Sequence, residues 1–165
     1  IVGSFSTLHK SKEYSINLIN DFCKNNSNKN KYFLVPQLLP PVAWYFGGSV
    51  KLELFNSLED LKIMQKIECD YCLDISHAFM CGFKEKNFLT FLSNNFNLVK
   101  HLHIAGAEGL DGEGESLKKM TALQQKFLNE VMDLPCIKVI EVWQGHLNNF
   151  IGFKKALCEL EEIIL

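Results

Sequence analysis

The chain of 165 residues is 47% hydrophobic and carries 17 basic and 19 acidic side chains, for a formal net charge of −2. This near balance argues against a general binder of nucleic acid, which normally shows a strong basic surplus. No run of 18 apolar residues exists, so no membrane span is expected. The six cysteines do not form an evenly spaced framework, which favours reduced thiols and a cytoplasmic setting.

Along the chain, short apolar runs typical of strands alternate with stretches of helical spacing. The predicted strands cover residues 1–5, 32–35, 71–73, 98–104 and 137–142. The predicted helices lie around residues 14–22, 58–64, 88–92, 123–131 and 153–164. The second helix is expected to begin at Ser57, with Glu59 and Asp60 in its first turn.

This alternation of strand and helix, repeated about five times, predicts an α/β fold with a parallel sheet. Residues 1–165 are therefore interpreted as one domain. A closed (β/α)8 barrel needs about 250 residues, more than the chain has. Two architectures stay open: a doubly wound open sheet of five strands, or the C-terminal five βα units of a TIM barrel with outer helices.

Polar side chains occur where three successive predicted strands end. Asp74 closes the strand at 71–73, His103 lies at the end of the next, and Glu141 lies at the end of the last. The carboxyl ends of parallel strands meet at one edge of the sheet, so these groups are expected to converge. Two carboxylates and an imidazole form a ligand set for a divalent cation that accepts oxygen and nitrogen.

Simpler roles exist for these residues. Asp74 is also a typical helix cap, and His77 is also compatible with a loop. His101 and His103 share one face of their strand because they are two residues apart. Glu141 interrupts an apolar run in a strand that is expected to be buried, and a buried carboxylate needs a partner, for which a metal ion is the strongest choice.

Two cysteines, Cys69 and Cys72, form a CxxC pattern. Such a pair alone suggests a redox pair or half of a zinc site. A second CxxC is missing from the sequence, and the alternation of a strand would place the two thiols on opposite faces. We therefore interpret this pair as structural.

Two connections are unusual for loops between strand and helix. Residues 105–115 are rich in glycine and long, which favours a functional loop. Residues 36–48 are aromatic and contain three prolines, and Trp44 lies in this segment. Aromatic faces over a polar opening suit sugar rings. The residues expected to bind substrate at this rim are His101, Trp44, Trp143, Gln144 and His146.

Four motifs, taken in their order along the chain, resemble those of the xylose isomerase-like TIM-barrel superfamily. They lie at residues 72–78, 101–105, 112–114 and 140–143. Its members include sugar phosphate isomerases and epimerases and endonuclease-type barrels. The match runs from about Tyr32 to the C-terminus. The resemblance implies a barrel that lacks its N-terminal βα units in this chain, so a missing barrel half or a homo-oligomer is expected to cover the open sheet.

The resemblance also implies residue roles. Asp74, His103 and Glu141 are similar to three metal ligands of the family, and His77 resembles a residue that contacts substrate or metal. The fourth family ligand is a glutamate, and this chain has Gln37 at that place. Gln37 offers an amide oxygen to a cation but brings no charge and does not act as a base.

The expected function is that of an isomerase or epimerase of a small sugar or sugar phosphate, dependent on Mn²⁺, Mg²⁺, Co²⁺ or Zn²⁺. Glu141 would be the general base next to a metal-polarised carbonyl, and His77 would orient a substrate hydroxyl. One alternative is a sugar-binding or assembly domain that has lost the reaction, which Gln37 favours. Phosphodiester cleavage is a weaker alternative, because it usually needs more metal ions and more histidines than the five present.

Overall fold

The computed structural model describes residues 11–30, 32–45, 47–110 and 112–164. The strand predicted at residues 1–5 lies outside these ranges. The helices are α1 (Lys12–Asn30), α2 (Leu58–Lys66), α3 (Ile75–Lys84), α4 (Phe88–Ser93), α5 (Ala122–Met132) and α6 (Leu147–Ile164). None of these helices has the length and apolar character needed to cross a bilayer.

The central sheet is parallel and consists of β3 (Tyr71–Asp74), β4 (Val99–Ile104) and β7 (Ile137–Ile140), in this order. The segment before β3 continues the sheet through a parallel bridge between Gln37 and Cys72. These four segments lie side by side in the order of the sequence, without the reversal that marks a doubly wound sheet. The predicted parallel α/β fold is confirmed.

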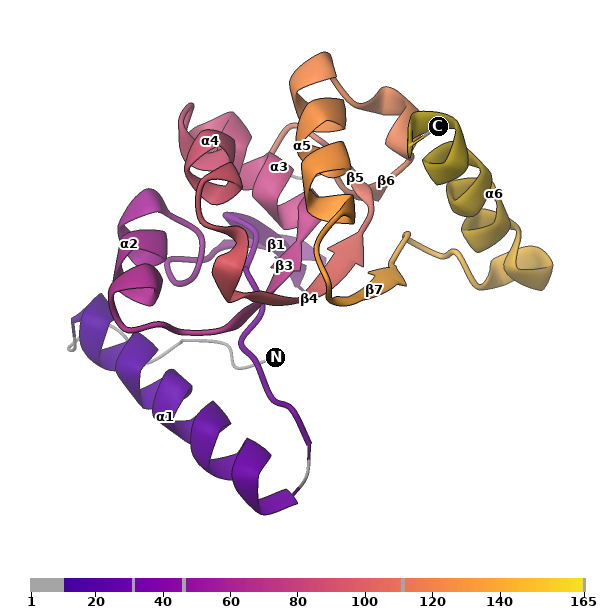
Figure 1. Cartoon of the computed structure of the whole chain (residues 1–165). Coiled ribbons are helices and arrows are strands. Elements are labelled where there is room, and N and C mark those ends of the chain that lie inside the picture. Colours follow the sequence, from indigo (N-terminus) through magenta and orange to yellow (C-terminus); the bar gives the residue numbers. More distant parts are fainter. Residues whose placement is uncertain (1–10, 31, 46, 111, 165) are drawn as a thin grey trace.

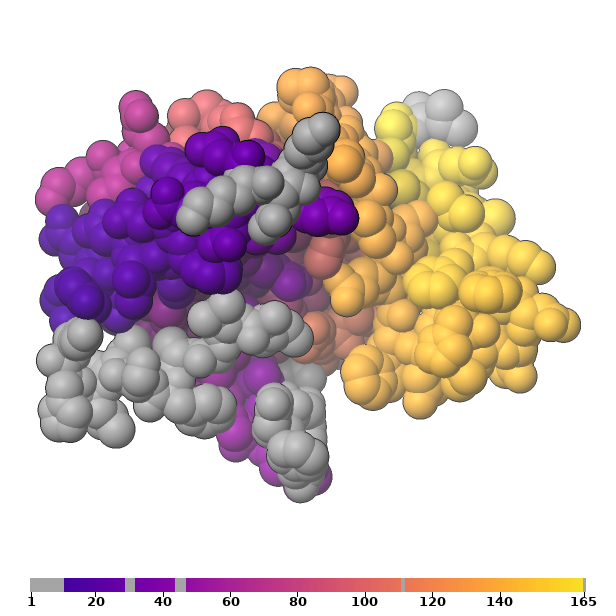
Figure 2. All heavy atoms as spheres, turned by 90° about the horizontal axis from the view of Figure 1, so that it is seen from below, coloured from indigo at the N-terminus to yellow at the C-terminus, as the bar shows by residue number. Residues whose placement is uncertain are grey.

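The helices follow the same order around the sheet. α1 packs on α2, α2 on α4, α4 on α5, and α5 on α6. Figure 1 shows α1 and α6 at opposite ends of the molecule, and the view from below in Figure 2 agrees. Within the parallel sheet, β3 and β4 are each followed by helices before the chain returns to the next strand.

The two faces of the sheet differ sharply. Leu73, Leu102 and Ile104 point to the face that is packed against the helices, and all three are buried. Ile137 and Val139 of β7 point to the other face, and Ile137 is 70% exposed. The alternation of side chains along each strand thus separates a hydrophobic core from an open face.

Local signals explain several helix starts. Ser57 caps α2 by accepting a hydrogen bond from the backbone N–H of Asp60, as predicted. Thr121 and Gln124 form a capping box at the start of α5. In α6, the backbone at Asn148, Asn149 and Phe150 is left-handed, so regular helix begins only after these residues.

Several elements differ from the prediction. Residues 32–35 form no strand, and only Gln37 bridges to β3. The helix α3 was not predicted, nor were the hairpins of β1 (Val42–Tyr45) with β2 (Gly48–Lys51) and of β5 (Gly106–Glu108) with β6 (Gly112–Glu115). The hairpins depend on pairing between two segments, and the prolines and glycines around them had indicated loops.

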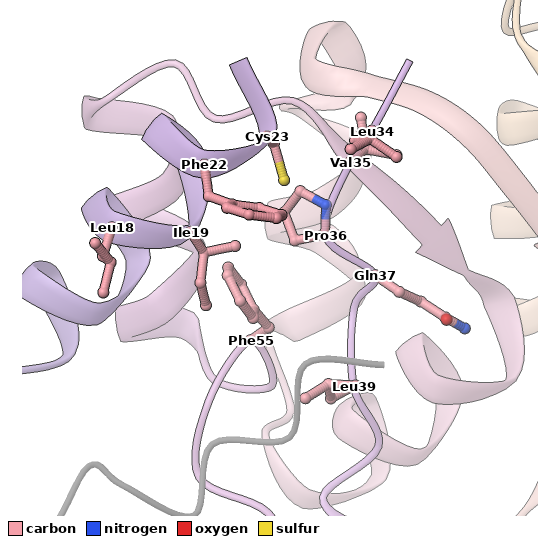
Figure 3. Close-up of a pocket in the computed structure, with 10 residues that line it drawn as sticks. All are labelled: Leu18, Ile19, Phe22, Cys23, Leu34, Val35, Pro36, Gln37, Leu39 and Phe55. Atoms are coloured by element: carbon pink, nitrogen blue, oxygen red, sulfur yellow. The ribbon is translucent and has the colours of Figure 1, made fainter. Parts of the chain in front are cut away.

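The helix α1 is only partly packed against the core. Leu18 and Phe22 are more than half exposed, whereas Ile16 is fully buried. Leu18 and Phe22 line a cavity of about 560 Å³ together with residues 34–37, Leu39 and Phe55. Figure 3 shows that this cavity is apolar and that the side chain of Gln37 points away from α1.

Candidate metal centre

The ends of three parallel strands bring Asp74, His103 and Glu141 together. Their ligand atoms all lie within 4.8 Å of one another. His103 Nδ1 lies 2.6 Å from Glu141 Oε2 and 3.7 Å from Asp74 Oδ2. Sheet register explains the convergence, because Asp74 pairs with His103, His103 pairs with Val139, and Glu141 follows Val139 by two residues on the same face.

Asp74 is held by several donors. It is buried and accepts hydrogen bonds from Gln37 Nε2 at 2.8 Å, from Ser76 Oγ at 3.1 Å and from the backbone N–H of His77 at 3.1 Å. The last bond also caps α3, so Asp74 has the capping role considered above as well as its place in the cluster. Burial raises the pKa of its carboxyl, but the neighbouring His103 and the charge of His77 lower it by more, and the net pKa is below the usual value.

His103 carries a positive charge between the two carboxylates. Its neighbours Asp74, Cys72 and Glu141 raise its pKa to about 12. The hydrogen bond with His103 in turn lowers the pKa of Glu141. Without a cation, the protonated imidazole offsets one of the two carboxylate charges, and a metal ion that binds here must displace its proton. Two carboxylate oxygens and one imidazole nitrogen fit Mg²⁺, Mn²⁺, Co²⁺ or Zn²⁺.

Glu141 reaches the cluster, but not as a buried residue. Its side chain is 60% exposed, and β7 is open to solvent on the face that Glu141 shares. The expectation of a buried strand at this place is therefore wrong, and so is the inference that burial of this carboxylate requires a metal. An exposed carboxylate is instead accessible to a substrate from the open face.

Gln37 lies at the cluster, at the position where the resemblance implies a glutamate. Its amide nitrogen donates to Asp74 Oδ2 and lies 3.3 Å from His103 Nδ1. A metal ion is bound by the amide oxygen and not by this nitrogen. In this arrangement Gln37 therefore holds a ligand in place, and its predicted role as a ligand requires a rotated amide.

His77 is buried, with both ring nitrogens engaged. Nδ1 lies 2.6 Å from the carbonyl oxygen of Leu38, and Nε2 lies 2.8 Å from Glu113 Oε1. Both partners are acceptors, so both nitrogens donate and the ring is charged. Burial lowers the pKa of His77, but the hydrogen bond with Glu113 and the charge of Asp74 raise it, and the net pKa is raised. In this arrangement both ring nitrogens are occupied and neither is left for the predicted substrate contact, while the backbone N–H of His77 positions Asp74.

Sequence reasoning did not assign a role to Glu113. It lies in β6, whose hairpin with β5 follows β4 directly. The tract at 112–114 had stood out as a family-like motif, and its one charged residue was the available signal. Within the glycine-rich segment, β5 and β6 thus pair with each other, and β6 brings Glu113 to the His77 side chain.

The predicted substrate-binding residues do not all lie at the cluster. His101 is adjacent to the cluster, with its ring centroid 4.9 Å from that of His103. Trp143, Gln144 and His146 lie in the turn after β7, and all three are exposed. The backbone N–H of Trp143 donates to the carbonyl of Gly114 at 3.2 Å, which ties this turn to β6. Trp44 belongs to β1, and its side chain lies outside the described part of the structure.

No protein-family model matches this chain. Over 123 residues the chain is 26% identical to the glycine–tRNA ligase beta subunit of Rickettsia canadensis (strain McKiel). The matched stretch covers 73% of this chain and 18% of that subunit. The chain thus spans less than a fifth of the length of this curated relative.

Proposed function

We propose that this chain is part of a divalent-metal-dependent isomerase or epimerase that acts on a small sugar or sugar phosphate. The observation that carries the proposal is the convergence of Asp74, His103 and Glu141 at the carboxyl ends of three consecutive parallel strands. In α/β folds this edge of the sheet is where reactive groups gather.

The architecture supports a barrel segment as the scaffold. Neighbouring strands follow the order of the sequence, and α1, α2, α4, α5 and α6 pack on one another in that order. In a closed barrel the face without helices is the interior, and the polar groups of that face line the mouth. Here that face carries Asp74, His103 and Glu141 and is open at β7.

The residues have distinct roles in this proposal. Asp74, His103 and Glu141 would hold the cation, which would polarise a sugar carbonyl and so lower the barrier to proton removal from the neighbouring carbon. Glu141 is ionised and exposed, and its free oxygen would accept that proton. Gln37 and His77 hold Asp74 in a fixed orientation through hydrogen bonds to its side chain.

Metal binding is the first test. Isothermal titration with Mn²⁺ is expected to show one site in the metal-free protein, and Asp74→Asn and Glu141→Gln are each expected to weaken it at least tenfold. Asp70→Asn and Glu130→Gln, outside the cluster, are the controls and should bind as the wild type does. Titrations with Mg²⁺, Co²⁺ and Zn²⁺ then establish which cation is preferred.

Proton transfer is the second test. In ²H₂O, NMR with a panel of aldose and ketose phosphates is expected to show exchange of the hydrogen next to the carbonyl, with the rate reduced at least a hundredfold in Glu141→Gln. Absence of cation binding, or exchange that Glu141→Gln leaves unchanged, would contradict the proposal.

A second candidate is a sugar-binding scaffold that lacks the reaction, and Gln37 favours it. A single base at Glu141 does not serve both faces of a substrate carbon, and Gln37 offers no second carboxylate. Gln37→Glu distinguishes the two candidates. If the wild type binds no cation and the variant gains affinity, the non-catalytic role is correct.

The likeness to the glycine–tRNA ligase beta subunit supplies no further candidate. The matched stretch is 18% of that subunit at 26% identity, too little to transfer its activity.

A further inference from the structure

A second group of potential ligands lies beside the oxygen-rich cluster. The ligand atoms of Cys72, His101 and His103 all lie within 4.8 Å of one another. The group is built by the same sheet register: Cys72 on β3 pairs with His101 on β4, and His103 follows two residues later on the same face. The rings of the two histidines meet edge to face, 82° apart.

The chemistry of this group differs from that of the first cluster. One thiolate and two imidazoles are ligands that Zn²⁺ prefers, and a fourth position remains for water or another donor. His101 and His103 are partly exposed on the open face, which gives an ion access, whereas Cys72 is buried behind them.

This arrangement is not the CxxC site that the sequence suggests. Cys69 lies three residues before Cys72, is fully buried, and its thiol contacts the carbonyl of Asp70 at 3.6 Å. Cys72 instead joins two histidines that come from a different strand and lie about 30 residues later in the chain. Only pairing between β3 and β4 brings these three residues together.

We propose that Cys72, His101 and His103 form a binding site for a thiophilic divalent cation of the Zn²⁺ class. On binding, the Cys72 thiol and the protonated His103 imidazole each release a proton to solvent, and the resulting thiolate sulfur and imidazole nitrogen coordinate the ion together with His101. His103 belongs to both groups, so an ion at this site competes for His103 with an ion at Asp74 and Glu141. The proposal goes beyond the isomerase function, because it requires no sugar substrate.

Co²⁺ is a suitable probe, because a cobalt–thiolate bond gives a charge-transfer absorption that oxygen and nitrogen ligands do not give. The full chain, reduced and free of thiol chelators, is expected to show this band with Co²⁺ and to lose it when Zn²⁺ is added. Cys72→Ser should abolish the band, whereas Cys69→Ser, the matched buried cysteine, should retain it. A band that survives in Cys72→Ser, or that is absent from the wild type, overturns the proposal.

A second variant guards against misfolding of Cys72→Ser. His101→Gln changes a partly exposed residue, and it is expected to weaken Zn²⁺ binding at least tenfold with an unchanged far-ultraviolet circular dichroism spectrum. Equal Zn²⁺ affinity in His101→Gln and the wild type would contradict the site. Lys100→Gln, at the exposed neighbouring position, is the control.

The two metal proposals fail independently. Glu141→Gln is expected to weaken Mn²⁺ binding and to leave the cobalt–thiolate band intact, whereas Cys72→Ser should remove the band and leave Mn²⁺ binding intact. Failure of the wild type to bind Mn²⁺ would refute only the proposed function, and absence of the cobalt–thiolate band from the wild type would refute only the Zn²⁺ site.

Discussion

The two faces of the three-stranded sheet differ, with apolar packing on one and titratable side chains on the other. On the face covered by helices, Leu73, Leu102 and Ile104 are buried within the hydrophobic core. On the opposite face, the same strands carry Asp74, His101 and His103, and β7 remains open. Adjacent residues of one strand thus experience opposite environments, so a change at residue 102 and a change at residue 103 should affect different properties.

The largest expected effect tests the covered face. Leu102 is 0% exposed, and Leu102→Ala should lower the free energy of unfolding by about 2–5 kcal/mol because it leaves a cavity in the core. Ile137→Ala, on the open face, should change it by less than about 0.5 kcal/mol. Urea denaturation followed by circular dichroism measures both. A similar loss in the two variants would show that the face at β7 is covered in solution.

The next effect concerns Asp74 on the open face. Asp74→Asn keeps a helix-capping side chain but removes the charge beside His77 and His103, and we expect the metal-free protein to lose about 1–3 kcal/mol at pH 7.

This contribution has a definite pH dependence. The pKa of Asp74 is below its ordinary value of 3.8, so its stabilising effect is complete above that pH and is lost as the pH falls through the lowered pKa. The stability difference between the wild type and Asp74→Asn should therefore shrink below about pH 4. Urea curves between pH 2.5 and pH 7 measure it, with Asp70→Asn as the control, and a difference that stays constant down to pH 2.5 would contradict the interpretation.

At His77, a smaller effect on stability is expected, and its dependence on pH runs in the opposite direction. Its pKa is raised above 6.5, so the stabilisation from its protonated form is complete below pH 6.5 and is lost as the pH rises through the raised pKa. Glu113→Gln removes a half-exposed carboxylate, and it should lower the pKa of His77 and cost less than about 1 kcal/mol at pH 6. An NMR titration of the histidine ring resolves the pKa. Glu115→Gln, two residues later in β6, should leave it unchanged.

The smallest effect concerns association through the open edge. β7 has no strand beyond it among the described residues, and Ile137 is exposed beside that edge. Such edges pair with other chains, so light scattering should show a mass that rises with concentration, and Ile137→Lys should reduce the rise. A monomer of constant mass at all concentrations would argue against the expected partner for this face.

Parts of the fold could be predicted because they depend on local signals. The strands β3, β4 and β7 are runs of apolar residues, and Ser57 marks the start of α2 by a cap. The rule that parallel strands end at one edge was enough to anticipate that Asp74, His103 and Glu141 would lie together. Other parts depended on pairing between distant segments, among them the β5–β6 hairpin that brings Glu113 to His77.

The sequence by itself determined the alternation of strands and helices, the parallel sheet and the three polar strand ends, because periodicity and caps are encoded within a few neighbouring residues. Only the tertiary structure decided which face each side chain occupies and what covers it. It placed Glu141 in solvent, turned Gln37 into a donor to Asp74 and joined Cys72 to two histidines. These outcomes follow from strand register and helix coverage, which depend on contacts between segments far apart in the chain.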